Sequence, residues 1–379
     1  MASKIIYILV FAYVAFQLYK TYNYHFKFEK LKLKPNSSFE EELEQVDLWL
    51  KKLEKNHKFN GAILISQNEK PLLKSVYGYA DFERKRYLDL NHSFRLASVS
   101  KQFTAIGILK LLTLQKLSLD EKVENLIKNF PYKEVTIRHL LNQTSGVPDC
   151  YMELAEKHKE SLGDFLTIQK AKDLVIKYVQ KPKSKPGQIY EYSNTNYILL
   201  AALIEDMSGQ CFEDFMQKEV FMPLKMKNSR VWNLASKNLN FPKKVDDWEN
   251  DEEDYQKIEP GWIDGVAGDG AVHSSINDME VWVKFLFGTS QNFINPDLFY
   301  QIFQKPRILN GEESHYGFGM VIEDGYYWHN GSWLGARTYV SHYFNSKIDL
   351  VLLNNSSSEV FDKIQNALHE VLASHSDHE

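Results

Sequence analysis

The stretch FRLASVSKQFTA, residues 94–105, places a charged side chain inside an apolar helical pattern. The apolar positions continue at helical spacing into Ile106 and Leu109, so the sequence predicts a buried helix that begins near Ser98. Lys101 follows Ser98 by about one helical turn, and burying an unpaired ammonium is costly. Either Lys101 reaches solvent, or a site in the protein uses it.

Ser98 and Lys101 form a Ser-x-x-Lys pair, a spacing that occurs only here in the chain. On a helix the two side chains share one face and can reach each other. A lysine in a partly apolar pocket loses affinity for its proton, and it can then accept the proton of a serine hydroxyl. The alternative is a helix cap at Ser98 and a solvated side chain at Lys101.

The segment YEYSNTNY, residues 190–197, contains a second polar cluster, Tyr192-Ser193-Asn194. Side chains two residues apart in an extended segment point to the same side. A phenolate can accept a proton when nearby cations lower its pKa, and a carboxamide can hold a substrate carbonyl or a lysine. The alternative is a polar loop packed by aromatic residues.

The segment WHNGSWLG, residues 328–335, follows a predicted hairpin turn at Asp324-Gly325. In His329-Asn330-Gly331, the glycine would let a substrate backbone approach the strand closely. An edge strand of this kind could align an acyl substrate and contribute the N–H of Ser332 to an oxyanion hole.

The composition describes a folded protein with a substantial core. The 379 residues are 44% apolar and 25% charged, and the net charge of -5 gives no basic surface for nucleic acid. Cys150 and Cys211 cannot form a disulfide framework, so we expect two buried thiols, with a single bridge as the alternative. No His, Cys or acidic spacing fits a metal site, and we expect no cofactor.

The first residues differ from the rest of the chain. Residues 5–19 form an apolar run that suits a signal peptide or a short membrane anchor. Several lysines follow the run, which counts against simple export because positive residues favour the cytoplasmic side. We expect residues 1–37 to be a signal or anchor segment plus a tether, on a protein that is exported, periplasmic or membrane-anchored.

Residues 38–375 read as one catalytic domain, with an α/β part at about 38–115 and 276–375 and a mainly helical part at about 116–275. Apolar spacing predicts a helix over 39–53, two strands joined by a turn at 67–70, a three-stranded meander after residue 316 and a closing helix over 358–372. The acidic run DDWENDEED, residues 246–254, predicts a solvated loop.

In chain order, Ser-x-x-Lys, Tyr-x-Asn and His-x-Gly resemble the three motifs of the penicillin-recognising serine hydrolases. Tyrosine in the second motif is similar to the class C β-lactamases, the D-Ala-D-Ala carboxypeptidases and related esterases. Three more segments resemble stretches of this family: HLLNQTSGVPD (139–149), GDGAVHSSINDMEVWVKFL (268–286) and YGFGM (316–320). The resemblance covers about residues 40–370.

The resemblance implies an α+β fold, in which an antiparallel sheet is flanked by helices and carries an inserted, mainly helical subdomain. The site would lie between the two parts. The resemblance implies three catalytic residues, with Ser98 as the nucleophile and with its proton shared by Lys101 and Tyr192. It implies five substrate-binding residues: Asn194, His329, Asn330, Gly331 and Ser332.

One departure from the family pattern bears on the substrate. Many members have Lys-Thr-Gly where this chain has His-Asn-Gly, and a histidine is charged only part of the time near neutral pH. We therefore expect a serine hydrolase that acts through an acyl-enzyme on a small ester, amide or D-amino-acid peptide. A β-lactamase or D-Ala-D-Ala carboxypeptidase is one alternative, and a non-catalytic acyl-binding sensor or scaffold is another.

Overall fold

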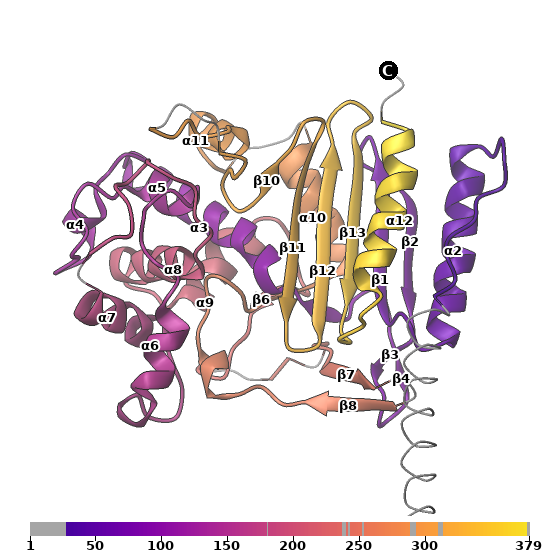
Figure 1. Ribbon diagram of the computed structural model, residues 1–379, viewed down its shortest axis with the longest axis horizontal. Helices are drawn as coiled ribbons and strands as arrows, with labels where there is room; N and C mark the ends of the chain where they lie inside the picture. The colour runs from indigo at the N-terminus through magenta and orange to yellow at the C-terminus, as the bar shows by residue number, and fades with distance from the viewer. Residues whose placement is uncertain are drawn as a thin grey trace, which may run out of the picture.

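The computed structural model describes residues 28–376 except 180, 237–239, 242, 252–253, 289–292 and 310–313, so the predicted signal or anchor at 5–19 lies outside the described residues. An antiparallel sheet of six strands forms the centre of the protein (Figure 1). Its order is β10 (Val321–Ile322), β11 (Tyr326–Trp333), β12 (Ala336–Tyr343), β13 (Ile348–Asn354), β1 (Gly61–Gln67) and β2 (Lys70–Tyr77).

Tight turns set the register of the hairpins in this sheet. Asn68 and Glu69 both have positive φ between β1 and β2, as a two-residue hairpin turn requires. Gly325 has a φ of 95° between β10 and β11, where the sequence predicts the Asp-Gly turn. The meander β11–β12–β13 is also confirmed.

Both faces of the sheet are buried, because the apolar residues of β1 and β13 run without interruption. Ile63 and Leu352 point to one face, where they pack with α2 (Phe39–Lys55) and α12 (Phe361–Ser374). Leu64 and Val351 point to the other face, which α10 (Ile276–Phe287) and α3 (Ser100–Gln115) help to cover. The fold is therefore α+β, with helices on both sides of an antiparallel sheet (Figure 1).

A mainly helical region lies beside the edge of the sheet that β10 and β11 form (Figure 1). Its helices are α4 (Val123–Leu126), α5 (Ile137–Leu141), α6 (Tyr151–Lys157), α7 (Ile168–Tyr178), α8 (Asn194–Ser208) and α9 (Phe212–Met216). The long buried helix α8 packs against α3 in the larger core, which joins the helical region to the sheet.

Short strands that the sequence analysis missed lie before and within the interval predicted as mainly helical. A second sheet joins β5 (Ser93–Arg95), β9 (Val272–Ser275) and β6 (Arg230–Val231). Each of these strands is too short for a period-2 pattern to stand out, and their pairing spans distant parts of the chain.

The acidic run is a second correction, because it is a hairpin and not a solvated loop. Strands β7 (Asp247–Asp251) and β8 (Asp254–Ile258) pair antiparallel. Trp248 is fully buried, and the Asp247 carboxylate forms an ion pair with the buried guanidinium of Arg95, with Oδ2 3.1 Å from Nε. A buried partner from a distant strand offsets the cost of burying this carboxylate, and local charge density does not reveal such a partner.

Residues 28–37, which the sequence analysis assigns to a tether, lie against α2. The indole of Trp49 donates a hydrogen bond to the carbonyl of Glu29 at 2.7 Å.

Two further short strands, β3 (Tyr79–Asp81) and β4 (Arg86–Tyr87), pair after β2. Among the described residues we find no helix with the length and apolar character needed to cross a bilayer. Cys150 and Cys211 are both half-buried free thiols.

Candidate active site

Lys101 lies at the centre of the predicted site, and its side chain is completely buried. Its Nζ is within hydrogen-bond distance of three oxygens: Ser98 Oγ at 3.1 Å, Asn194 Oδ1 at 2.8 Å and the backbone carbonyl of Asp269 at 3.0 Å. The first two belong to the predicted motifs, and Asp269 does not. The structure therefore brings the Ser-x-x-Lys and Tyr-x-Asn segments together around one buried nitrogen.

Whether each of these three oxygens can donate or only accept determines with which of them Lys101 can exchange a proton. The oxygens of Asn194 and Asp269 can only accept, so they take two N–H groups. The Ser98 hydroxyl can either accept an N–H from an ammonium or donate its O–H to the lone pair of a neutral amine. One proton can therefore pass between Ser98 and Lys101 along an existing hydrogen bond.

Asn194, the first residue of α8, is oriented by a carboxylate on its other side. Its Nδ2 donates to Asp149 Oδ2 at 3.0 Å while its Oδ1 accepts from Lys101. Because a carboxylate accepts and an ammonium donates, only this orientation of the amide satisfies both neighbours. Asp149 also accepts from the backbone N–H of Thr195, which fixes the loop before α6 to the start of α8.

Tyr192 covers Lys101 with its ring. The Nζ of Lys101 lies 5.0 Å from the ring centroid, within the range of a cation–π contact. The ring also packs edge-on against Tyr316, with a centroid separation of 5.9 Å. In the described part of the chain, no hydrogen bond joins the Tyr192 hydroxyl to Ser98 or Lys101, so the phenol lies beside the pair without a direct bond to it.

Ser98 lies in a short 3-10 turn, Ala97–Val99, and α3 begins two residues later than the predicted start at Ser98. Ala97 has a φ of 46°, a left-handed conformation that costs a residue with a side chain about 1–2 kcal/mol. Neighbouring segments hold this turn, since Thr338 Oγ1 donates to the carbonyl of Leu96 at 2.8 Å. Strain beside a reactive residue is common in functional sites.

Gly331 allows β11 to lie directly against this turn. A Cβ at position 331 would be 2.4 Å from the carbonyl oxygen of Leu96 and 3.0 Å from the backbone nitrogen of Ser98. Glycine is therefore required by close approach, as the sequence analysis proposed, although here the approaching chain is the protein's own backbone. β10 pairs only with Tyr327 and Trp328, so residues 329–333 have no described strand on that side.

His329 differs from the expectation of a histidine that is charged part of the time. It is buried, and burial together with the nearby Lys101 lowers its pKa to about 3. Its Nδ1 donates to the carbonyl of Asn330 at 2.6 Å, so Nε2 accepts from the Tyr316 hydroxyl at 3.0 Å. The imidazole is neutral at pH 7 and holds Tyr316, whereas the Asn330 side chain is exposed.

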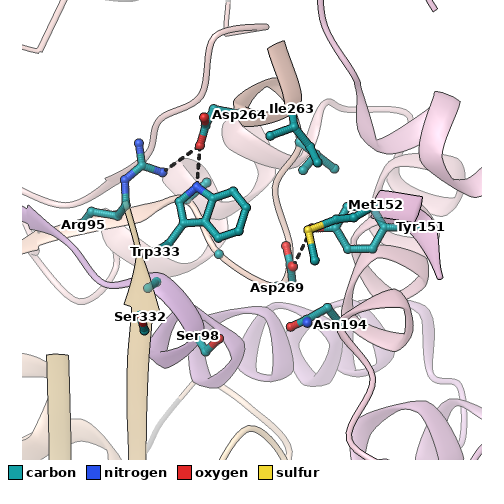
Figure 2. Close-up of a pocket in the computed structure, with 14 residues that line it drawn as sticks. Arg95, Ser98, Tyr151, Met152, Asn194, Ile263, Asp264, Asp269, Ser332 and Trp333 are labelled. Carbon is teal, nitrogen blue, oxygen red and sulfur yellow. Dashed lines mark hydrogen bonds and ion pairs between the residues drawn. The ribbon is translucent and has the colours of Figure 1, made fainter. Parts of the chain in front are cut away.

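A cavity of about 220 Å³ opens beside Ser98 (Figure 2). Of the predicted residues, Ser98, Asn194 and Ser332 line it. Two carboxyl groups that the sequence analysis did not single out, those of Asp264 and Asp269, also line it. The cavity thus gives a small molecule access to the Ser98 hydroxyl.

The segment that contains Asp269 is bound to α3 by three hydrogen bonds. Besides the contact from Lys101, Thr104 Oγ1 donates to the carbonyl of Gly268 at 2.6 Å, and the N–H of Val272 donates to Ser100 Oγ at 3.1 Å. The hydroxyl groups of Ser100 and Thr104 indicate that this buried helix needs hydrogen-bond partners, but they do not indicate which segment supplies them. Nowhere in the described ranges do three or more His, Cys, Asp or Glu side chains gather in a way that could hold a metal ion.

Comparisons with known proteins agree with this fold. Penicillin-binding protein 4* of Bacillus subtilis (strain 168) is 32% identical over 332 residues, covering 81% of this chain and 70% of that protein. The D-aminopeptidase of Gluconobacter oxydans (strain 621H) is 26% identical over 305 residues, covering 79% of this chain and 56% of that protein. The crystal structure of a penicillin binding protein from Bacillus halodurans matches with a TM-score of 0.71 at 24% identity, covering 85% of this chain and 98% of that one.

The family described as Beta-lactamase matches residues 46–374, a range that contains all three motifs and the whole six-stranded sheet. The match extends over most of the chain, and the B. subtilis relative independently supports it. The chain therefore belongs to the Beta-lactamase family.

Proposed function

We propose that this protein is a serine hydrolase that forms an acyl-enzyme at Ser98 with small ester, amide or D-amino-acid peptide substrates. The observation that carries the proposal is the hydrogen bond between Ser98 Oγ and Lys101 Nζ, whose two other contacts are with oxygens that can only accept. This arrangement leaves the serine hydroxyl as the one partner with which Lys101 can exchange a proton.

In the acylation step, Lys101 takes the proton of the Ser98 hydroxyl as Oγ bonds to the substrate carbonyl carbon. The N–H groups of Ser98 and Ser332 would bind the oxyanion that forms. The close approach of Gly331 to the Ser98 backbone supports this pairing, because it brings β11 alongside the turn. The tetrahedral intermediate then releases the alcohol or amine, which leaves with the proton that Lys101 accepted.

In the deacylation step, water attacks the acyl carbon while Tyr192 accepts a proton from it. The bond between the acyl carbon and Oγ breaks, the carboxylic acid leaves, and Oγ receives the proton that Tyr192 took from the water. The Nζ of Lys101, neutral again once the leaving group has departed, lies 5.0 Å from the centre of the Tyr192 ring, so both proton-handling groups border the acyl-enzyme. Asn194 would keep Lys101 in place and offer its remaining N–H to the substrate.

The substrate class follows from the absence of an anchoring charge at position 329. Neutral, buried His329 cannot pair with a substrate carboxylate, which β-lactams and D-Ala-D-Ala peptides carry. This favours esters, amides and D-amino-acid peptides over β-lactamase or D,D-carboxypeptidase substrates. The similarity to a D-aminopeptidase supports this preference.

The rival proposal from another class is a non-catalytic acyl-binding sensor or scaffold. A protein of this kind would need the cavity but not the proton-exchanging contact, and the complete set of acceptors around Lys101 argues against it. For the location, we propose export or membrane anchoring through residues 5–19, which fractionation of cells expressing the full chain and the chain from residue 28 would test.

The experiment that tests the proposal is active-site labelling of the purified protein with a fluorescent fluorophosphonate and a fluorescent penicillin. Wild type, Ser98→Ala and, as a control, Ser161→Ala at an exposed serine are compared. We expect fluorophosphonate labelling that is lost only in Ser98→Ala, and turnover of p-nitrophenyl butyrate that greatly exceeds turnover of a chromogenic cephalosporin. Equal labelling of Ser98→Ala and wild type would support the scaffold, and efficient cephalosporin turnover would support the β-lactamase.

A further inference from the structure

The cavity beside Ser98 contains an acidic group that the proposed acyl transfer does not use. Apolar side chains such as Met152 and Ile263 form part of its wall, and Asp269 lies between them and Ser98 (Figure 2). The backbone carbonyl of Asp269 binds Lys101, but its carboxyl group points to the cavity side of the segment.

The Asp269 carboxylate keeps unused acceptor capacity. The Tyr151 hydroxyl donates to its Oδ2 at 2.9 Å, and the backbone amide of Asp269 itself is a second donor. An ionised carboxylate has about four lone-pair positions, so it can accept further hydrogen bonds from a molecule in the cavity. Burial raises the pKa of this carboxyl group, while Lys101 and the Tyr151 hydroxyl act in the opposite direction.

The other charges that line the cavity already have partners. Asp264 accepts from the indole of Trp333 at 2.6 Å and from the backbone N–H of Gly261 at 2.8 Å. The Arg95 guanidinium pairs with Asp247 at 3.1 Å and with Asp264 at 3.6 Å. Figure 2 shows Arg95 and Asp264 grouped at one side of the cavity, with the Trp333 ring between them and Asp269.

Arg95 is not placed to receive an anionic ligand. Its Nη2 is buried without a hydrogen-bond partner in the structure, so a molecule in the cavity cannot touch it. Its other nitrogens face Asp247 and Asp264. The Asp264 side chain is only 3% exposed and pairs with Arg95, whereas Asp269 is half-buried and forms no ion pair with another described side chain. Of the charged groups that line the cavity, Asp269 is therefore the more accessible acceptor for a ligand.

We propose that the cavity binds a protonated amine of the substrate, with the Asp269 carboxylate as its counter-charge. The substrate class is then an ester, amide or peptide with a free amino group near the scissile carbonyl. Asp269 and Ser98 line the same small cavity, so the amine and the reacting carbonyl would belong to one short acyl group. This inference rests on the proposed acyl transfer at Ser98 and adds a specificity-determining residue to it.

The test compares three ligands of similar shape and different charge as inhibitors of p-nitrophenyl butyrate hydrolysis: 2-phenylethylamine, 2-phenylethanol and 3-phenylpropionate. We expect the amine to inhibit at a concentration at least about tenfold lower than the alcohol, because a charge-assisted hydrogen bond is stronger than a neutral one. In Asp269→Asn this difference should disappear. Glu153→Gln removes an equal charge from an exposed position on α6 and should keep the difference.

The proposal would be overturned if 2-phenylethanol and 2-phenylethylamine inhibit the wild type equally. It would also be overturned if 3-phenylpropionate inhibits more tightly than the amine. If Asp269→Asn does not fold, Tyr151→Phe provides the second variant, and its amine preference should fall by severalfold because a carboxylate donor is lost. Should p-nitrophenyl butyrate not be hydrolysed at all, acyl transfer fails, yet calorimetric titration of the three ligands still measures the charge preference of the cavity. The two failures are therefore distinguishable.

Discussion

Replacing Gly331 with alanine tests how closely β11 must approach the turn that carries Ser98. The new Cβ would lie 2.4 Å from both the Leu96 carbonyl oxygen and Thr338 Oγ1, where ordinary contact begins near 3.4 Å. Thr338 can rotate its side chain, but the Leu96 carbonyl is backbone and itself accepts the Thr338 hydrogen bond. The strand and the turn must therefore separate by about 1 Å.

A separation of this size acts on activity more than on stability. Overpacking a buried site costs about 1–3 kcal/mol, which a domain with this core tolerates. Displacing reacting groups by about 1 Å, in contrast, can reduce the rate by roughly a hundredfold. We therefore expect Gly331→Ala to fold, to melt a few degrees lower, and to lose about two orders of magnitude in the rate of fluorophosphonate labelling.

The assay measures the second-order labelling rate and the melting temperature of wild type, Gly331→Ala and Gly261→Ala. Gly261 is the matched control, because a Cβ there meets its nearest atom, Asp264 Oδ2, at 4.0 Å. Gly261→Ala should label at the wild-type rate. If Gly331→Ala labels within about threefold of wild type, the contact between β11 and the Ser98 turn does not position the reactive groups.

Two further predictions concern Lys101 and His329. Lys101→Met keeps most of the side-chain volume but removes the proton acceptor, so kcat/KM for p-nitrophenyl butyrate should fall by roughly a hundredfold to ten-thousandfold, and a loss below about tenfold would contradict the assigned role. The pKa of His329 falls from 6.5 in the unfolded chain to about 3, so below pH 6.5 the unfolded state binds the extra proton, and stability decreases as the pH falls towards 3. Between pH 7 and pH 4 this loss amounts to roughly 3 kcal/mol, and urea unfolding of wild type and His329→Gln at these two pH values should show a smaller loss in the variant.

The elements that the sequence predicted well are those with local signals. The hairpin at residues 67–70, the meander β11–β12–β13 and the helix after Ser98 all follow from short patterns of apolar residues and turn residues. The meeting of Ser98, Lys101 and Asn194 is non-local, and only the order of the three motifs pointed to it. The resemblance to a family therefore predicted that these three side chains meet, which the spacing of residues alone does not predict.

The features that the sequence did not predict depend on partners far away in the chain. Asp247 is buried because Arg95 pairs with it, and a run of acidic residues gives no sign of this partner. The pKa of His329 is low because the imidazole is buried and lies near Lys101, so its residue type alone did not indicate its charge state. Asp269 enters the site through a backbone carbonyl, which is present at every position and leaves no trace in the sequence.

These contacts also explain why a Ser-x-x-Lys pair on an ordinary helix is not enough for the proposed chemistry. On a solvated helix face, water would satisfy Lys101, and the hydroxyl of Ser98 would be one weak partner among many. In this fold, Asp149 orients Asn194, and Asn194 with the Asp269 carbonyl occupies two of the three directions around Nζ. The remaining direction leads to Ser98. Helix α8 supplies one acceptor and the segment before β9 supplies the other, so the fold directs the third contact of Lys101 to Ser98, as the proposed proton transfer requires.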